Sequence, residues 1–173
     1  ELPDDPPDVD LDWPTYSGKK RQLPWFLLSA LLMAQNGVRV CMQGTEGHTP
    51  GRLYSSEALK FLGVPEAGSM SEAADHIRAS NFAYLPLRVI HPRLQEIIEL
   101  KPIIGVRSPV NTFARMINPF SASYEMHTVF HPNYRDVHRE TAQLLGQPHM
   151  AVFKGEGGEA ERRPHKPGLV QSI

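Results

Sequence analysis

The residues of this chain that can do chemistry are cations gathered in short clusters. One cluster precedes a long apolar run, one residue lies in the next loop, and the last cluster flanks a glycine-rich segment. These cations are Lys19, Lys20, Arg21, Arg52, Lys154, Arg162 and Arg163. Several lysines and arginines without a base-reading pattern suit sequence-independent contact with the phosphate backbone of a nucleic acid.

The glycine-rich segment, residues 154–161, has the sequence KGEGGEAE. Gly155, Gly157 and Gly158 are predicted to leave backbone N–H groups open to a phosphate. Tyr16, beside the first cluster, is a candidate for stacking on a base. The simpler interpretation is that the KKR triplet is a solvated turn and that the later cations are ordinary surface charge.

A helix and a strand must position the first cluster. Residues 23–34 are almost all apolar but too few to cross a bilayer, which takes about 20 residues. They predict a central helix covered on all sides, with Trp25 and Phe26 in the core. Residues 38–42 are predicted to form a strand, and Gly44 opens the loop at its carboxyl end, where open α/β sheets bind ligands.

The rest of the chain predicts strands that alternate with helices. Strands are predicted at residues 82–85, 126–130 and 150–153, and helices at 55–63, 69–78, 92–100, 109–116 and 134–145. This alternation implies βαβ units and a largely parallel sheet, hence an α/β fold. Residues 1–14 are acidic and proline-rich and are predicted to be a linker, whereas residues 165–173 are expected to be loose.

Composition bounds the class of protein. The 173 residues suit one domain, with 40% apolar residues, 21% charged residues and a formal net charge of −1. With so little net charge, contact with nucleic acid must depend on local segregation of charge. The single cysteine, Cys41, excludes an internal disulfide. Without a signal peptide or transmembrane run, the chain is expected to be cytoplasmic and to have no membrane partner.

The histidines and the cysteine predict no further site. The spacings of His127, His131, His138 and His149 match no zinc signature, so these residues are interpreted as structural or solvated. Cys41 is interpreted as a small buried apolar residue rather than a nucleophile.

Four longer segments carry a resemblance to a known family. They are VDLDWPTYSGKKRQLPWFLLSALLMAQNGVRVCMQG, GVRSPVNTFARMINP, FHPNYRDVHRETAQLLGQ and VFKGEGGEAER. Together they resemble the substrate domain of the anthranilate phosphoribosyltransferase-like proteins, glycosyltransferase family 3. Within that family they are most similar to the YbiB-like branch, which is described as nucleic-acid binding.

The resemblance implies a nucleoside phosphorylase and phosphoribosyltransferase type of fold, with three layers around a central, mostly parallel sheet. It also implies that residues 15–173 are part of a larger protein, whose N-terminal helical domain and C-terminal part are absent from this chain. In the full-length protein, the family pattern implies a homodimer.

The resemblance places the family's phosphate-binding turn, GTGGD, on residues 14–18, where only Thr15 matches. Tyr16 and Ser17 put side chains where the family has bare backbone, although Gly18 follows them. Gly44 keeps a glycine of the segment after the next strand.

The family's metal-binding Asp-Glu pair falls on Ala160 and Glu161, so one carboxylate is missing. Glu156 and Glu159 are weak candidates to replace it. Lys101 stands in place of the arginine that meets anthranilate, and a lysine cannot form the same bidentate clamp. We therefore expect the parent reaction to be lost.

The leading hypothesis is a nucleic-acid-binding protein that contacts single-stranded DNA or RNA without sequence preference and needs no cofactor. The alternative is a phosphoribosyltransferase-like enzyme that acts on a ribosyl or phosphorylated substrate, with Mg²⁺ held by Glu156, Glu159 or Glu161. A third hypothesis is a regulatory or scaffolding relative with neither property.

Overall fold

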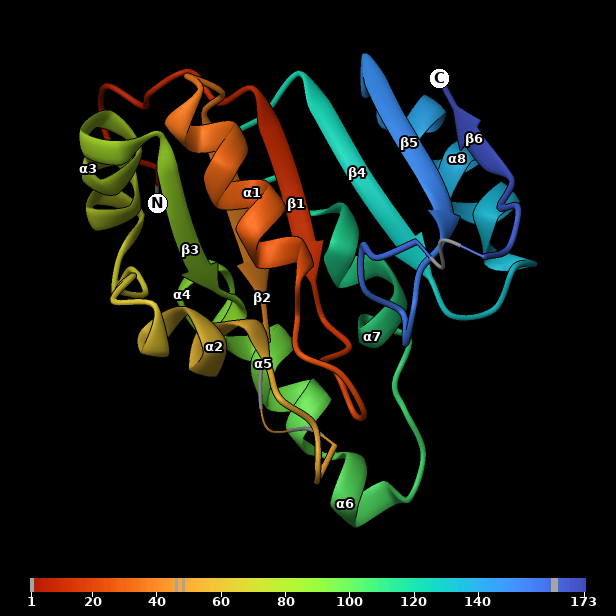
Figure 1. Cartoon of the computed structure of the whole chain (residues 1–173). Coiled ribbons are helices and arrows are strands. Elements are labelled where there is room, and N and C mark those ends of the chain that lie inside the picture. The colour runs from red at the N-terminus through yellow and green to blue at the C-terminus, as the bar shows by residue number, and fades with distance from the viewer. Residues whose placement is uncertain (1, 46, 48, 163–164) are drawn as a thin grey trace.

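The centre of the computed structural model, which describes residues 2–45, 47, 49–162 and 165–173, is a six-stranded sheet. Its order is β3-β2-β1-β4-β5-β6, with β6 antiparallel to β5 and the other pairs parallel (Figure 1). The strands are β1 (Leu11–Thr15), β2 (Val40–Gly44), β3 (Phe82–Pro86), β4 (Tyr124–Val129), β5 (His149–Lys154) and β6 (Val170–Ser172). The predicted α/β fold with a mostly parallel sheet is confirmed.

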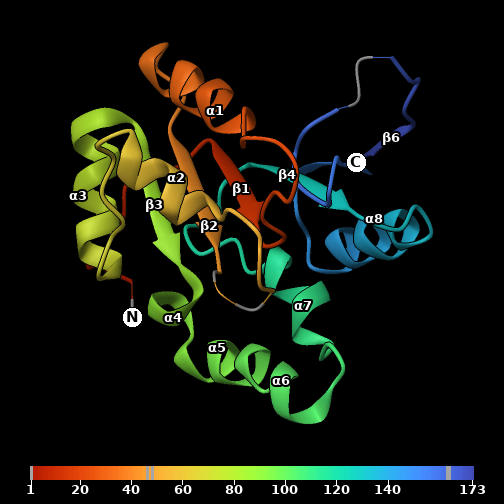
Figure 2. The ribbon, with the colours of Figure 1, turned by 60° about the horizontal axis from the view of Figure 1, so that its bottom comes forward.

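Helices cover both faces of this sheet. The helices are α1 (Phe26–Gln35), α2 (Ser55–Phe61), α3 (Met70–Ser80), α4 (Leu87–Ile90), α5 (Pro92–Glu99), α6 (Lys101–Ile104), α7 (Val110–Phe113), the 3-10 helix η1 (Ala114–Met116) and α8 (Tyr134–Leu144), of which α5 and α6 lie beyond the carboxyl ends of the strands (Figure 1). On one face α1 and α2 pack on Trp13 and Met42. On the other face α3 packs on Cys41 and α8 on Val152 (Figure 2). The fold therefore has three layers.

Residues 11–14 lie in the central strand β1, so the predicted linker over residues 1–14 is wrong at its carboxyl end. Composition misled there because Asp12 and Pro14 are both uncommon in central strands. Pro14 has no backbone N–H to donate to β4. The structure accommodates the proline because the β1–β4 ladder ends at Asp12, so no donor is needed at Pro14.

Helix α1 is not covered on all sides, which corrects the predicted central helix. Phe26 and Leu27 are buried, but Leu28, Leu32 and Trp25 are 49%, 60% and 57% exposed. One face of α1 packs on the sheet, and nothing in the described part of the chain covers the opposite face. Among the helices described, none is long and apolar enough to cross a membrane.

Two other segments differ from prediction. The short helix α4, which was not predicted, lies between β3 and the predicted helix at residues 92–100, and the carboxyl-terminal residues expected to be loose form the edge strand β6. Both depend on neighbours: Leu87 of α4 is fully buried in a small core, and Gln171 of β6 pairs with Val152 of β5. Ser69 caps the start of α3, since its side chain accepts the backbone N–H of Glu72, while the Glu72 carboxylate accepts the N–H of Gly68.

We predict that Cys41 does not react with thiol reagents in the folded protein. The thiol is 1% exposed, and burial, assisted by the charge of Asp12, raises its pKa well above the ordinary value. Because the thiolate is the reactive form, a disulfide reagent at pH 8 should label the chain only after unfolding in guanidinium. A Ser71→Cys variant, which adds a thiol at an exposed position of α3, is the positive control. Rapid labelling of the native protein at Cys41 would contradict this burial.

Candidate phosphate-binding edge

Because β1 to β5 are parallel, their carboxyl ends lie along one edge of the sheet, called here the carboxyl edge. The loop after β1 pairs with the loop after β2, since Lys19 and Leu53 exchange two backbone hydrogen bonds of 2.8 Å. The Lys19 side chain reaches the loop after β5, where it donates to the carbonyl of Glu156 at 3.3 Å. The structure thus brings the predicted basic clusters onto one edge.

A carboxylate of the chain itself occupies the turn after β1. Glu159 Oε1 accepts the backbone N–H groups of Ser17, at 2.5 Å, and Gly18, at 2.6 Å. The Glu159 side chain is completely buried, and burial raises its pKa above the ordinary value. Two convergent N–H groups are the arrangement that binds an anion, and here the anion is supplied in cis.

Arg115, from η1, secures this arrangement. The guanidinium is 7% exposed and donates to Ser17 Oγ at 2.6 Å and to the Gly158 carbonyl at 3.3 Å. Its positive charge acts on Glu159 and opposes the rise of the pKa caused by burial. The turn, the glycine-rich loop and η1 therefore form one charge-balanced unit, which we call the Glu159 lock: Ser17, Gly18, Arg115, Gly158 and Glu159.

Lys19 is not a free cation of the edge, which corrects its predicted role. It is 4% exposed and forms a short ion pair with Glu161. Glu159 and Glu161, the weak metal candidates, are therefore engaged by the turn and by Lys19 respectively. Thr15, at the end of β1, is also buried and shares a hydrogen bond of 2.6 Å with Ser55.

The glycines of the last loop serve packing rather than an open anion site. A Cβ on Gly155 would lie 1.8 Å from the Glu159 carbonyl, and one on Gly158 would lie 2.6 Å from Ser17 Oγ. Their N–H groups are already bonded, from Gly155 to the Val129 carbonyl and from Gly158 to the Gly155 carbonyl. The prediction of open N–H groups is thus wrong for these two, whereas Gly157, with a positive φ of 70°, makes the turn between them.

Two further glycines hold the turn after β1. A Cβ on Gly44 would lie 2.1 Å from the Thr15 carbonyl, so the close pairing of β1 and β2 requires glycine there. Gly18 has a φ of 64°, a conformation that other residues rarely adopt. Both glycines let two backbone segments of this chain come close to each other, rather than letting the backbone approach a bound phosphate.

The cations that remain at the surface surround the Glu159 lock. Lys20, Arg21, Lys154 and Arg162 are exposed. Arg52 is half-buried and donates to the carbonyls of Ser17 and Gly18 at 2.9 and 3.0 Å. A shallow groove of about 450 Å³ is lined by Lys20, Arg21, Arg52 and their neighbours. Arg163 lies outside the described residues.

The two aromatic side chains nearest the first cluster have exchanged their predicted roles. Tyr16 is 3% exposed and donates its hydroxyl to Gln43 Oε1 at 2.8 Å, so it cannot stack on a base. Trp25, predicted to be core, is 57% exposed immediately before α1, at the carboxyl edge. Trp25 and Phe26 lie side by side in one apolar run and had the same prediction, and only the packing of α1 on the sheet separates them.

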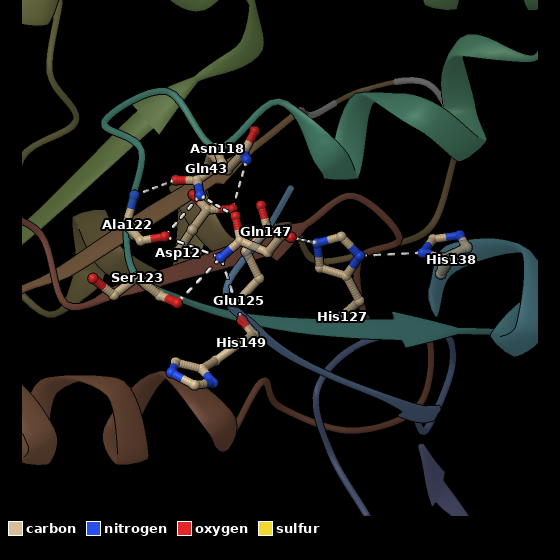
Figure 3. A network of polar contacts seen from close by, with 10 residues as sticks. All are labelled: Asp12, Gln43, Asn118, Ala122, Ser123, Glu125, His127, His138, Gln147 and His149. Carbon is tan, nitrogen blue, oxygen red and sulfur yellow. Dashed lines mark hydrogen bonds and ion pairs between the residues drawn. The ribbon is translucent and has the colours of Figure 1, made fainter. Parts of the chain in front are cut away.

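A network of buried polar side chains, which the sequence did not predict, lies inside the sheet (Figure 3). Gln43 Nε2 donates to Asp12 Oδ2 at 2.9 Å, and Asp12 and Glu125 are partners across β1 and β4. Glu125 Oε2 lies 3.2 Å from His127 Nε2, and the Nδ1 atoms of His127 and His138 are 3.2 Å apart.

Burial shifts the pKa values of two members of this buried polar network, Asp12 and His138. It raises the pKa of Asp12 well above its ordinary value, against the effect of the Gln43 hydrogen bond and together with the charge of Glu125. Burial also lowers the pKa of His138 to about 3, so this imidazole is neutral near pH 7. The sequence signal for these residues was weak, because their proximity arises from strand pairing rather than from spacing along the chain.

Comparison with known proteins finds relatives of this chain. No family model matches the chain. It is 31% identical over 158 residues to an uncharacterized protein of Aquifex aeolicus (strain VF5), covering 90% of this chain and 46% of the relative. It is 27% identical over 140 residues to the anthranilate phosphoribosyltransferase of Polynucleobacter necessarius subsp. necessarius (strain STIR1), covering 81% of this chain and 41% of the relative. The chain thus spans less than half the length of these relatives.

Two solved structures of anthranilate phosphoribosyltransferases have a similar fold. The crystal structure of anthranilate phosphoribosyltransferase from Thermus thermophilus matches with a TM-score of 0.76 at 25% identity, over 96% of this chain and 54% of that one. A Saccharomyces cerevisiae anthranilate phosphoribosyltransferase variant in complex with 4-fluoroanthranilate matches with a TM-score of 0.73. At 16% identity over 97% of this chain and 46% of that chain, this second likeness concerns the fold alone.

We predict that the Glu159 lock is a major source of stability. Glu159→Ala leaves two buried N–H groups without their acceptor and Arg115 without its counter-charge, so unfolding in urea should show a loss of about 3 kcal/mol. Glu159→Gln keeps an oxygen acceptor and should lose about 1–2 kcal/mol.

The control is Glu96→Ala, which removes a carboxylate from an exposed pair with Arg93 and should change stability by less than about 0.5 kcal/mol. If Glu159→Ala costs no more than this control, the lock does not hold the edge together.

Proposed function

We propose that this chain, an anthranilate phosphoribosyltransferase-like protein, binds the phosphate backbone of single-stranded nucleic acid along its carboxyl edge and does not read the base sequence. One observation carries the proposal. The turn at the place where the resemblance puts diphosphate binding already holds the carboxylate of Glu159, while the cations around it face solvent.

The remaining cations suit an extended polyanion better than a compact one. Lys20 and Arg21 follow the turn after β1, whereas Lys154 ends β5 and Arg162 follows the glycine-rich loop. A linear backbone with a charge at each nucleotide can meet such separated cations in turn, whereas a single diphosphate cannot. Arg52 lines the same surface and stabilises the turn by donating to the carbonyls of Ser17 and Gly18.

Trp25 favours single strands over a duplex. Trp25 is exposed and donates its backbone N–H to the carbonyl of Leu23, which lines the cationic groove. Its indole offers a face on which an unpaired base can stack, whatever the identity of the base. In a duplex the bases are already stacked and only the phosphates would be reached. The proposal therefore combines electrostatic attraction with sequence-tolerant stacking.

Phosphoribosyl transfer would require the edge to be rebuilt. Glu159 would have to leave two N–H groups, and Glu161 would have to leave Lys19, before either carboxylate could serve Mg²⁺. Lys19 and Arg115 would then be left as buried, unbalanced charges. These contacts oppose the alternative function for this chain.

We predict that binding of a fluorescent oligo-dT by the full-length protein weakens steeply with salt, as phosphate neutralisation requires. Replacing Lys20 and Arg21 together by Gln removes two cations, so the slope of log affinity against log salt should fall by about 1.4. Lys19 is left in place because its side chain is structural.

The control removes two cations from elsewhere, Arg39→Gln with Arg78→Gln. Arg39 directly precedes β2, at the opposite end of the strand, and Arg78 lies on α3. The control should retain the slope of the parent protein. Absence of binding at low salt, or equal effects of both double variants, would refute the proposal. Magnesium-dependent binding of phosphoribosyl pyrophosphate in calorimetry would instead favour the enzyme.

We also predict that Trp25 contacts the bound strand. Trp13 is 3% exposed, so a change of tryptophan emission on adding oligo-dT should report on Trp25. Trp25→Ala should weaken binding by about 1–3 kcal/mol if one base stacks there, with little change in salt slope. Leu28→Ala, which alters an exposed apolar residue further along α1, should leave affinity unchanged. Emission that does not respond to saturating oligo-dT would place the strand elsewhere.

A further inference from the structure

Three metal-ligating side chains meet inside the sheet, away from the Glu159 lock. Asp12 from β1 and Glu125 and His127 from β4 project on the same side of the sheet (Figure 3). Each offers one ligand atom, and these atoms all lie within 4.8 Å of one another. Asp12 and His127 are fully buried, and Glu125 is 5% exposed.

Two atoms of these side chains that can bind a metal have no hydrogen-bond partner. Asp12 Oδ1 and His127 Nε2 are both buried without one, although Asp12 Oδ2 is bonded to Gln43. Glu125 Oε2 lies 3.2 Å from His127 Nε2, but their alignment does not make a hydrogen bond. Buried polar atoms are rarely left unsatisfied, so this cluster calls for an occupant.

We propose that Asp12, Glu125 and His127 form a binding site for one divalent transition-metal cation, with Zn²⁺ as the ion that suits the donor set best. Zinc takes imidazole nitrogen and carboxylate oxygen in a tetrahedral arrangement with bonds of about 2.0–2.2 Å. Two such ligands are then about 3.3–3.6 Å apart. The 3.2 Å between Glu125 Oε2 and His127 Nε2 is close to that spacing.

Charge balance supports a cation at this position. Two carboxylates in one buried cluster repel each other and are costly to desolvate unless an opposite charge compensates them. Among the described residues, the cluster includes no lysine or arginine, and Gln43, which donates to Asp12, is uncharged. A divalent ion would cancel both negative charges at once.

Outer contacts already orient two of the ligands. His138 Nδ1 lies 3.2 Å from His127 Nδ1, and when His127 donates this bond its Nε2 carries the lone pair toward the carboxylates. Gln43 Nε2 fixes Asp12 Oδ2 at 2.9 Å, and Tyr16 in turn fixes Gln43. Such supporting partners are typical of metal-bound histidines and carboxylates.

The location suggests a structural role for the ion. The β1–β4 ladder consists of two partner pairs and ends at Asp12 and Glu125, whereas the β1–β2 ladder has five pairs and the β4–β5 ladder has six. An ion bound by Asp12 and Glu125 with His127 would join the strands where their hydrogen bonds stop. Of the three side chains, Glu125 also lines a cavity of about 440 Å³, together with Asn118 and Gln147.

The test is titration of the full-length, chelator-treated protein with ZnCl₂, followed by calorimetry and by thermal unfolding. We expect one Zn²⁺ per chain and a rise of the melting temperature. Asp12→Asn and His127→Gln should each weaken binding by at least about 100-fold, and the outer variant His138→Gln by about 10–100-fold. Controls are Asp136→Asn and His149→Gln, which alter an exposed acid and an exposed histidine and should keep full affinity.

Asp12→Asn also separates loss of the site from loss of the fold. It removes a buried charge, so the metal-free variant should be folded and should not respond to zinc, whereas a surface site would respond as before. A Co²⁺-substituted protein gives a second readout, since a visible spectrum of tetrahedral type should appear and vanish in His127→Gln. Failure of the parent chain to bind zinc, or unchanged affinity in Asp12→Asn, would overturn the proposal and leave a proton shared by the two carboxyl groups as the occupant.

Discussion

The structure depends on the burial of one carboxylate, that of Glu159, in the turn at the end of β1. A buried anion must meet donors and a counter-charge, and here Ser17 and Gly18 supply the N–H groups while Arg115 supplies the charge. These groups come from a turn, the 3-10 helix η1 and a loop that are far apart in the sequence. The bonds to Glu159 Oε1 and the charge of Arg115 therefore fix these three segments relative to one another and shape the carboxyl edge.

That constraint also determines what the turn after β1 can hold. A turn that binds diphosphate must be empty and lined by bare backbone, whereas this turn is filled and closely packed against Gly158. Several cations outside the turn, among them Lys20 and Arg21, are exposed to solvent. Inward-facing Lys19 and outward-facing Lys20 illustrate the division between residues that hold the edge and residues that can meet a partner.

Buried charge recurs in the sheet itself. Asp12, Glu125 and His127 occupy interior positions that apolar side chains would fill at lower cost in desolvation. Outer contacts from Gln43 and His138 hold two of them in fixed orientations. A polar core of this kind favours one strand arrangement over its alternatives, because any shift of β4 against β1 would leave the carboxylates without their neighbours.

The sequence by itself determined the alternation of strands and helices and the parallel sheet, because the periodicity of apolar residues is a local property. It failed for β1, where Asp12 and Pro14 disguise a central strand, and for Trp25, whose neighbours are as apolar as those of the buried Phe26. Only the tertiary structure decided which cation is paired and which acid is buried. Ser17 and Glu159 are 142 residues apart, and they meet because parallel strands end at one edge of the sheet. No local pattern records that meeting.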